Sequence, residues 1–344
     1  MDFVKEMKAK AKSAQKKLVL PEGTDPRTVK AARIIMDEGL AASVSLIGKQ
    51  SEIDTIAARE GVDLTGVGVT NPELSPRRDV YAQAYYDLVH AKEEAKKAKG
   101  AVILEPMTLE KARIEIAEPL RWGAMMVHLG DADATVAGAE NTTGDVLRAG
   151  LSIIGTLPGL KTASSCFVIA GLDPQWGCGG ALIFSDCAVV PDPTAEQLAD
   201  IAQSAALSCR EFLGVEPVAA LLSFSTKGSA KHDDVAKVQK AVEILKSRNA
   251  GFVFDGELQA DAALVPGVTD KKAPGSPVRG KVNTLVFPDL GSGNIGYKLV
   301  QRLGKAEAYG PFLQGFAKPT SDLSRGASVA DIVTTAAVTL SRAK

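Results

Sequence analysis

Cysteine and histidine are scarce in this sequence, and neither is spaced for metal binding or cross-linking. The 344 residues include only 4 Cys and 3 His, and no C-x-x-C pair occurs. The sequence therefore predicts no zinc framework, no disulfide framework and no metal site. Cys166 and Cys187 lie in apolar, strand-like runs, so we expect small hydrophobic residues there. Cys166 alone is worth testing as a nucleophile.

The chain also lacks an excess of one charge and lacks long hydrophobic runs. It carries 40 Lys+Arg and 41 Asp+Glu, a net charge of −1, which excludes a general electrostatic attraction to nucleic acid or an anionic membrane. Apolar runs such as 218–222 are far shorter than the ~18 residues of a spanning helix. The basic N-terminal segment has no apolar signal-peptide region. We expect a cytoplasmic protein that binds neither nucleic acid nor membrane.

Apolar, strand-like runs alternate with amphipathic segments, which is typical of an α/β fold with mainly parallel sheets covered on both faces. The predicted strands are 17–23, 43–48, 101–105, 124–130, 161–171, 181–190, 218–225, 250–256 and 282–290. The predicted helices are 3–17, 27–39, 196–214, 233–248, 295–304 and 328–343.

The length suits two domains of roughly 150 residues each. Loop residues at 157–162 are a plausible crossing point, and the turn-rich run 315–326 allows the last helix to return to the first domain. We therefore predict one α/β domain from 1–157 with 316–344, completed by the C-terminal helix, and a second from 158–315.

A glycine loop near the C-terminus imitates a dinucleotide-binding fingerprint. Gly291, Gly293 and Gly296 form G-x-G-x-x-G between a predicted strand and a predicted helix, which is the setting such a fingerprint requires. The acidic residue expected about 20 positions later is missing, because Phe316 stands there. We expect a tight turn whose amide groups line a cleft, and no NAD site.

Two polar segments that follow predicted strands leave their function open. Residues 225–232 combine hydroxyl groups, a glycine and two lysines before a helix start, which suits a bound phosphate and an ordinary polar loop equally well. Asp255, Glu257 and Asp261 are able to bind Mg²⁺, although solvated or capping carboxylates are commoner.

A helix start at 141–148 carries a candidate anion-binding residue. Thr142 and Asp145 have the spacing of a capping box, and Arg148 follows within the next turn. Arginine binds phosphate through two parallel hydrogen bonds, although an exposed helical arginine is the commoner explanation of such a residue.

The segment 321–331 places a hydroxyl, a guanidinium and a carboxylate close together in sequence. Ser324 and Arg325 precede a helix whose first turn contains Asp331. Such a group is suited to binding an acyl phosphate and to deprotonating a nucleophile. Ser328 and Asp331 also form a capping box, which explains the carboxylate without any catalytic role.

Taken together, these segments resemble phosphate acetyltransferases (phosphotransacetylases) of the phosphate acetyl/butyryltransferase family, and the resemblance covers nearly the whole chain. The order and spacing of the matching segments support the resemblance more strongly than any single segment does. The matching segments are 18–32, 125–133, 141–148, 184–202, 222–232, 255–266, 273–289, 293–311 and 322–326.

The resemblance implies a fold, a reaction and partners. The fold is two doubly wound αβα domains, similar to isocitrate and isopropylmalate dehydrogenases, with the active site in the cleft between them. The reaction is acetyl-CoA + phosphate ⇌ acetyl phosphate + CoA, a step of acetate metabolism. CoA and acetyl-CoA are then substrates, and no cofactor is implied. A homodimer is common in the family.

The family's site residues fall on particular positions of this sequence. The resemblance implies Asp331, Ser324 and Arg325 in catalysis and Arg148 in substrate binding. It further implies substrate-binding roles for three more residues, which are Thr143, Lys298 and Tyr309. Relatives usually carry Asp where Gly291 stands, so the glycine fingerprint is coincidental.

The chemistry fits this set of residues. The thiol of CoA must become a thiolate to attack, and its ordinary pKa is about 8.5. Asp331 is implied as the base, and an ordinary aspartate is weak for that task, so we expect a partly desolvated site around it. Arg325 or Ser324 then stabilises the thiolate or the tetrahedral oxyanion. We expect direct transfer in a ternary complex without an acyl-enzyme.

The sequence departs from the family near residue 89. The family usually reads Tyr-x-x-Leu-Arg-Lys-x-Lys-Gly-Met-Thr there, and this arginine helps to bind CoA. Val89 stands in its place, and extra residues precede Met107. Three lysines of the inserted segment are candidates to replace the missing charge, namely Lys96, Lys97 and Lys99. Ala134 stands where relatives usually have Gly.

Three other functions stay open at this point. A phosphate butyryltransferase performs the same chemistry on a longer acyl chain. A decarboxylating dehydrogenase of the isopropylmalate type has a similar fold but binds NAD. A catalytically silent binding protein is conceivable because the CoA-binding arginine is missing.

Overall fold

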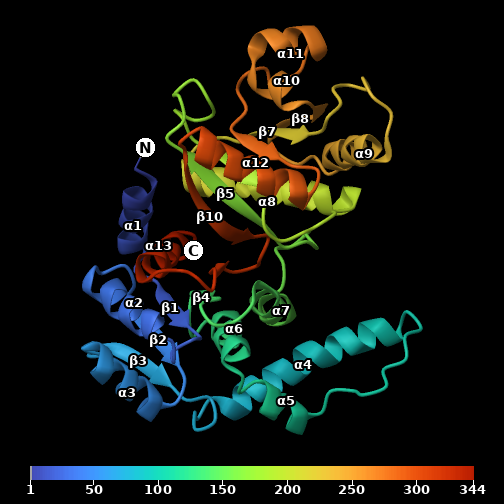
Figure 1. Cartoon of the computed structure of the whole chain (residues 1–344). Coiled ribbons are helices and arrows are strands. Elements are labelled where there is room, and N and C mark those ends of the chain that lie inside the picture. Colours follow the sequence, from blue (N-terminus) through green and yellow to red (C-terminus); the bar gives the residue numbers. More distant parts are fainter. Residues whose placement is uncertain (1) are drawn as a thin grey trace. The chain divides into compact units, whose positions relative to one another are not determined.

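The computed structural model describes residues 2–344, and the chain divides into two compact α/β units (Figure 1). The first unit contains Val4–Gly155 and Phe316–Lys344, and the second contains Thr156–Gly315 with the start of the chain through Phe3. The α/β fold class expected from the sequence is confirmed. That 1–157 with 316–344 and 158–315 are separate domains stays a prediction.

The first unit is built on a five-stranded parallel sheet. Its strands have the order β11-β4-β1-β2-β3, and every pair is parallel. The strands are β1 (Lys17–Leu20), β2 (Ser43–Ile47), β3 (Val67–Thr70), β4 (Ala134–Ala137) and β11 (Thr320–Asp322). The helices are α1 (Phe3–Ala14), α2 (Pro26–Asp37), α3 (Gln50–Glu60), α4 (Arg78–Lys97), α5 (Leu109–Glu115), α6 (Pro119–Leu129), α7 (Thr143–Ile153) and α13 (Val329–Ser341).

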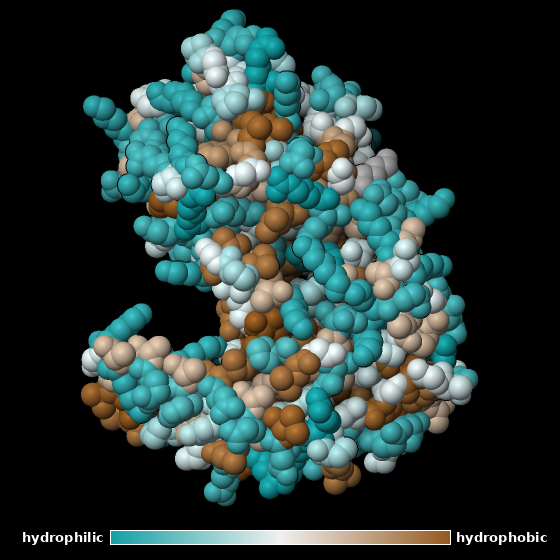
Figure 2. All heavy atoms as spheres, turned by 180° about the vertical axis from the view of Figure 1, so that it is seen from behind, coloured by the Kyte–Doolittle hydropathy of each residue, from teal (hydrophilic) through white to brown (hydrophobic). Residues whose placement is uncertain are grey.

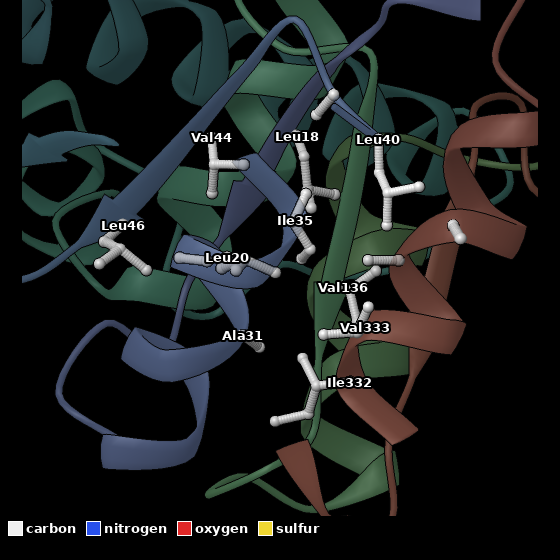
Figure 3. Close-up of a cluster of buried hydrophobic side chains, with 14 of the residues drawn as sticks. Leu18, Leu20, Ala31, Ile35, Leu40, Val44, Leu46, Val136, Ile332 and Val333 are labelled. Carbon is white, nitrogen blue, oxygen red and sulfur yellow. The ribbon is translucent and has the colours of Figure 1, made fainter. Parts of the chain in front are cut away.

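Both faces of this sheet are buried, because successive side chains of a strand point to opposite faces. Leu18 and Leu20 of β1 join a cluster with α2 and α13, to which Ile35 and Ile332 belong (Figure 3). Val19, between them in sequence, joins a second cluster with residues of α4, α5 and α6. Helices on both faces leave the ends of the strands as the accessible edges of the sheet.

The second unit has a six-stranded mixed sheet of order β10-β5-β6-β9-β7-β8. The pairs β10–β5 and β5–β6 are antiparallel, and the remaining pairs are parallel. Its strands are β5 (Ser164–Ala170), β6 (Leu182–Ser185), β7 (Val218–Leu222), β8 (Val253–Leu258), β9 (Thr284–Val286) and β10 (Glu307–Gln314). Its helices are α8 (Ala195–Leu213), α9 (Asp233–Ser247), α10 (Ala260–Leu264), α11 (Pro266–Lys272) and α12 (Leu290–Leu303).

Helices cover both faces of this sheet as well. Phe167 and Phe184 pack in one apolar cluster with Tyr297 and Val300 of α12. Helix α8 contacts the same strands but contributes no residue to that cluster, which places it on the opposite face. Helix α9 packs against α8 and β8.

Two of the predicted strands are wrong. Residues 124–129 belong to helix α6, and Gly130 is its C-cap with φ +84°. The helix begins at Pro119, and Glu118 caps its N-terminus. Periodicity alone does not distinguish a buried helix from a buried strand in a short apolar run. Here the capping residues on either side of the run indicate a helix. Residues 101–105 form no strand, and Val102 and Leu104 are exposed at 82% and 89%.

The face of the molecule drawn in Figure 2 is largely polar. Hydrophilic side chains cover much of the face in Figure 2, and hydrophobic ones lie among them in small groups. Within residues 2–344, no helix has both the length and the apolar character needed to cross a membrane.

Candidate active site

Three loops of the first unit emerge at one edge of its sheet. β11, β4 and β1 are neighbours and run parallel, so the loops that follow them meet at their carboxyl ends. This edge is where open α/β sheets bind ligands. The loops cover 21–25, 138–142 and 323–328, and the last contains Ser324 and Arg325.

Glu22 organises the loop after β4. Its side chain is 4% exposed, and its two carboxylate oxygens accept hydrogen bonds from four consecutive backbone N–H groups at 2.7–3.0 Å, those of residues 138–141. The side-chain amide of Asn141 adds a fifth bond at 2.9 Å. A buried charge is stable only when it is satisfied in this way, so Glu22 fixes the backbone that leads into α7.

Arg27 joins all three loops through one guanidinium. Nη1 donates to the carbonyl oxygens of Arg325 and Ala327 at 2.8 Å. Nη2 donates to the carbonyl oxygen of Ala139 at 2.8 Å and to Asp25 Oδ2 at 2.6 Å, and Nε also donates to Asp25. All five N–H donors are used, so only a planar arginine fork fits this position.

The Asp25–Arg27 pair is a stable ionic element of this edge. Burial alone would raise the pKa of Asp25, but the hydrogen bonds and positive charge of Arg27 outweigh it and hold that pKa below its usual value. Asp25 also caps α2 by accepting a hydrogen bond from the Arg27 backbone N–H at 2.7 Å. The guanidinium is therefore charged and oriented before any ligand binds.

Asp322 ends β11 in a confined space. It is 4% exposed, and its Oδ2 accepts a hydrogen bond from the Thr143 hydroxyl at 2.5 Å. Oδ1 is buried without a hydrogen-bond partner among the described residues. Gly138 has φ +114°, and a Cβ there would lie 2.5 Å from this Oδ1, so glycine is required for the carboxyl group to fit.

Helix α7 presents its N-terminus and Arg148 at this edge. Thr142 caps the helix by accepting from the Asp145 backbone N–H at 3.2 Å, but the reciprocal bond of the predicted capping box is replaced by one from the Thr142 hydroxyl to Asp145 at 2.7 Å. The first turn of a helix has N–H groups without intrahelical acceptors and attracts anions. Arg148 is exposed, and its only ion pair among the described residues joins it to Asp145 at 2.6 Å. An exposed pair contributes little stability, so Arg148 can exchange this carboxylate for a ligand anion.

Ser324 and Arg325 are exposed in the loop before α13. The Ser324 hydroxyl accepts a hydrogen bond from the Gly326 backbone N–H at 3.2 Å. The Arg325 guanidinium has no ion pair with any residue between 2 and 344, whereas Arg27 holds its backbone. The loop thus combines a fixed main chain with a free cationic side chain.

Asp331 occupies the capping box that the sequence predicted. Its Oδ2 accepts from the Ser328 backbone N–H at 2.9 Å and from the Ser328 hydroxyl at 2.8 Å. The carboxylate is exposed, so its neighbours in the structure do not supply the desolvation expected around it. Its structural role is visible, and its catalytic role stays a prediction.

Thr143, Arg148, Ser324, Arg325 and Asp331 all belong to the first unit, where they lie on α7, in the β11–α13 loop and at the start of α13. Lys298 and Tyr309 belong to the second unit. That all seven residues share a cleft between domains stays a prediction.

The two residues of the second unit have different surroundings. Lys298 is exposed on α12, with its Nζ 5.8 Å from the centre of the Tyr297 ring. Tyr309 lies on β10 and donates its hydroxyl to Glu307 at 2.6 Å. Burial, helped by that carboxylate, raises the pKa of Tyr309 to about 12, so this hydroxyl stays protonated and can donate.

The glycine fingerprint serves helix packing. Helix α12 starts at Leu290, and its cap Asp289 accepts the Ser292 backbone N–H at 2.7 Å. A Cβ at Gly293 would lie 2.2 Å from the carbonyl oxygen of Asp186. Close approach to the β6 loop explains this glycine, and nothing here favours a dinucleotide.

The polar loop 225–232 and the nearby carboxylates satisfy one another. Lys227 forms an ion pair with the buried Asp255, whose other oxygen accepts from Ser276 at 2.5 Å. Glu257 accepts from Ser225 at 2.9 Å and from the Gly228 backbone N–H at 2.7 Å. These contacts explain the loop structurally. No group of three His, Cys, Asp or Glu within residues 2–344 is placed to hold a metal ion.

The cysteines behave as hydrophobic residues. Cys166, Cys187 and Cys209 are buried, and no cysteine within residues 2–344 forms a disulfide. Burial raises the pKa of the Cys187 thiol far above its ordinary value and that of Cys209 to about 11. Neither thiol is activated as a nucleophile.

At the departure from the family, Val89 is half-buried on α4 and packs against the apolar cluster of α4, α5 and α6. Lys96, Lys97 and Lys99 are exposed at the C-terminal end of α4 and just beyond it, and Lys97 pairs with Glu94 at 2.8 Å. Their cationic groups are accessible to a polyanion.

Solved structures define the class to which this fold and site belong. A phosphotransacetylase from Streptococcus pyogenes superimposes with a TM-score of 0.88 at 39% identity, covering 99% of this chain and 98% of that one. The phosphotransacetylase EutD from Staphylococcus aureus gives a TM-score of 0.85 at 37% identity, covering 100% of this chain and 98% of that one. The chain has the phosphotransacetylase fold.

Sequence comparison gives the family. Residues 2–340 match the phosphate acetyl/butaryl transferase family. A phosphate acetyltransferase from Treponema pallidum (strain Nichols) is 58% identical over 343 residues, which are 99% of this chain and 98% of that protein. The chain belongs to the phosphate acetyl/butaryl transferase family, as its resemblance predicted.

Three residues of the site edge were not singled out from the sequence. Glu22 and Arg27 follow the first buried strand, and Asp322 ends the last one. A charged residue immediately after a buried strand is a usable signal, because it stands at the carboxyl end of a sheet. Their partners, however, lie far away in sequence.

Proposed function

We propose that the chain is a phosphate acetyltransferase that catalyses acetyl-CoA + phosphate ⇌ acetyl phosphate + CoA. The observation that carries the proposal is the edge of the first unit, where the unpaired Arg325, the exposed Arg148 and the N-terminus of α7 offer cationic and N–H groups suited to an anion. The high identity to proteins named phosphate acetyltransferase supports acetyl over butyryl transfer.

The proposed mechanism is direct transfer. The Asp331 carboxylate takes the proton of the CoA thiol, and the thiolate sulfur attacks the carbonyl carbon of acetyl phosphate. The tetrahedral oxyanion collapses, the C–O bond to phosphate breaks, and phosphate leaves with the bonding electron pair. No cofactor takes part.

The charges in this mechanism assign the remaining roles. Arg325 and the Ser324 hydroxyl stabilise the thiolate or the oxyanion. Both side chains are exposed, and Arg27 holds the backbone of the loop to which they belong. Arg148 and Thr143 bind the phosphoryl oxygens at α7. Lys298 and Tyr309 contribute a cation and a hydroxyl donor from the second unit.

The capping box engages one oxygen of Asp331 and leaves the other for proton transfer. One of its oxygens is held by Ser328, which fixes the direction of the other. In this proposal, bound CoA covers the exposed carboxylate and places its thiol against the free oxygen.

The biological setting is proposed as well. We infer a cytoplasmic enzyme of acetate metabolism that acts as a homodimer, with CoA, acetyl-CoA, acetyl phosphate and inorganic phosphate as its small-molecule partners. Neither nucleic acid nor membrane is a partner in this proposal.

The test is release of CoA thiol from acetyl-CoA and phosphate by purified protein, followed with a thiol reagent. Rates with acetyl-, propionyl- and butyryl-CoA, compared side by side, should be highest with acetyl-CoA. Arg325→Gln should lose most of this activity, whereas Arg59→Gln at the exposed C-terminal end of α3 should not. A higher rate with butyryl-CoA would replace the proposal by butyryl transfer.

A further inference from the structure

We propose that Asp322 is a positioning residue that sets the direction of the Thr143 hydroxyl, and thereby decides whether this hydroxyl can donate a hydrogen bond to the phosphoryl group at α7. This inference rests on the proposed function, because it assigns Thr143 to phosphate. It adds a proton-dependent step to substrate binding.

The contact between the two residues is specific. Asp322 Oδ2 and Thr143 Oγ1 are 2.5 Å apart, so one proton lies between them. Thr143 is the first residue of α7, immediately after the cap. Its hydroxyl therefore lies at the end of the helix that attracts anions.

The pocket around Asp322 accommodates the carboxyl group, but burial raises its pKa more than the Thr143 hydroxyl and the nearby Leu323 backbone N–H lower it. Gly138 leaves it room, and a side chain there would lie 2.5 Å from Oδ1. Oδ1 has no hydrogen-bond partner among the described residues, and no lysine or arginine within residues 2–344 forms an ion pair with it. A buried carboxylate without a cation is costly in its charged form.

Among the charged neighbours on the surrounding elements, Glu22 also disfavours the ionised form of Asp322, and the others are paired or hydrogen-bonded. Glu22, in the loop after β1, is negative and bound to the 138–141 backbone. On α7, Asp145 and Arg148 neutralise each other, and on α13 Asp331 is held by Ser328. Burial raises the pKa of Asp322 to about 6, and the charge of Glu22 adds to the rise. Both protonation states are therefore accessible near neutral pH.

The two states give Thr143 opposite abilities. When Asp322 is ionised it can only accept, so the Thr143 proton is committed to Oδ2 and its oxygen faces the ligand as an acceptor. When Asp322 is protonated it donates to Thr143 Oγ1, and the Thr143 proton is free to donate. Phosphate oxygens at neutral pH are mainly acceptors, so they bind the second state.

The experiment compares wild type with Asp322→Asn, Thr143→Val and Thr143→Ser. KM for phosphate and kcat are measured from pH 5.5 to 7.5 in the thiol-release assay. The Asn amide donates to Thr143 at every pH, so the ratio of the wild-type KM to the Asn-variant KM should rise at least fivefold over this range. Taking the ratio removes the titration of phosphate itself.

The threonine variants give an independent reading. Thr143→Ser should keep the wild-type pH profile, because it keeps the hydroxyl. Thr143→Val should raise KM several-fold at pH 5.5 and little at pH 7.5. Identical pH profiles of KM for wild type, Asp322→Asn and Thr143→Val would overturn the proposal. Should the Asn variant fail to fold, the Ser and Val variants decide it alone.

A control separates this role from a structural one. Asp200 is buried in the second unit and bound to Arg248 at 2.8 Å, so Asp200→Asn removes a buried carboxylate from the unit that does not contain Thr143. It should lower the melting temperature without changing the pH profile of KM. If wild type releases no thiol, the proposed function fails, and calorimetry of inorganic phosphate binding against pH in the same variants still tests the Asp322 switch.

Discussion

The Arg27 guanidinium donates a hydrogen bond to the backbone carbonyl oxygen of Arg325 at 2.8 Å, across 298 positions of sequence. The same group reaches Ala327 and Ala139. It therefore ties the loop that carries Ser324 and Arg325 to the loop that leads into α7. A cation whose five donors are all used on backbone carbonyls and on Asp25 is a positioning residue and leaves substrate contact to its neighbours.

Arg27→Lys should lower kcat/KM at least tenfold, because an ammonium offers three donors where five are used and lacks the planar fork. The expected loss of melting temperature is a few degrees. The control is Arg33→Lys on the same helix, whose guanidinium binds Asp37 and the carbonyl oxygen of Thr65 at the surface. Kinetic constants of Arg27→Lys within twofold of wild type would show that the loop holds its shape without this fork.

Local sequence patterns predicted those helices and strands that have clear periodicity, capping residues or apolar runs within their own bounds. The amphipathic helices α2, α8, α9 and α13 were predicted from periodicity and capping, and the strands β1, β5 and β7 from apolar runs. The run 124–130 was misjudged because the signals that decide for helix, Glu118 and Pro119, stand upstream of it. The helices α4 and α5 were missed, since their apolar residues are sparse and partly exposed.

In the site, too, the residues with a local or family signal were predicted, and the contacts between distant loops were not. Ser324, Arg325 and Asp331 were identified through the family resemblance, and the capping box of Asp331 through local spacing. Contacts that join distant loops have no local signature. Glu22 meets its partners 116–119 positions later, and Asp322 meets Thr143 across 179, so only the fold brings them together.

Arg148→Ala should raise KM for phosphate or CoA at least tenfold, which corresponds to about 1.4 kcal/mol of binding free energy. Its ion pair with Asp145 is exposed and contributes little stability, so the melting temperature should change by a degree or two at most. Steady-state kinetics with each substrate varied in turn measures the effect. If both KM values stay within twofold, Arg148 is an ordinary surface residue.

Neutralising Lys96, Lys97 and Lys99 together to glutamine should weaken CoA binding and flatten its salt dependence. These exposed lysines follow Val89, the position at which the resemblance implies a CoA-binding arginine, by 7 to 10 residues, and attraction between exposed charges is screened by salt. KM for CoA is measured at low and high ionic strength. A matched control neutralises three exposed lysines of the second unit, Lys240, Lys246 and Lys271. Equal KM values for the first variant and wild type at both salt concentrations would contradict the prediction.

Asp322→Asn should change how stability depends on pH. The pKa of Asp322 in the folded chain is about 6, above its ordinary value of 3.8, so between about pH 4 and 6 the folded state binds a proton that the unfolded state has lost. The free energy of unfolding therefore falls as pH rises through this window, by roughly 3 kcal/mol at most. The Asn variant lacks this slope and should gain stability relative to wild type above pH 6.

Urea unfolding at pH 4.5, 5.5 and 7.5 measures this difference. The chain has two tryptophans, and Trp122 is buried in the first unit. A Trp176→Phe background makes Trp122 the reporter of unfolding around Asp322. A constant difference between wild type and Asn variant at the three pH values would mean that Asp322 titrates as it does in the unfolded chain.

Asp331 is the residue for which structure and chemistry give competing explanations. Its hydrogen bonds with Ser328 account for it as a helix cap, and loss of a cap typically costs about 1 kcal/mol of stability. Loss of a general base typically costs 10²–10⁴ in rate. The two roles therefore differ in which measurement responds.

Three variants separate them. Asp331→Asn keeps the shape and removes the base, Asp331→Glu keeps a capping carboxylate but moves it by about one methylene, and Ser328→Ala removes the cap hydroxyl while leaving the carboxylate. We expect the Asn and Glu variants to melt within a few degrees of wild type and to lose kcat, the Asn variant at least a hundredfold. Ser328→Ala should lose more stability than rate. A fully active Asn variant would assign Asp331 to the capping box alone, because a group that supplies the proton-accepting step cannot be replaced by an amide without loss of rate.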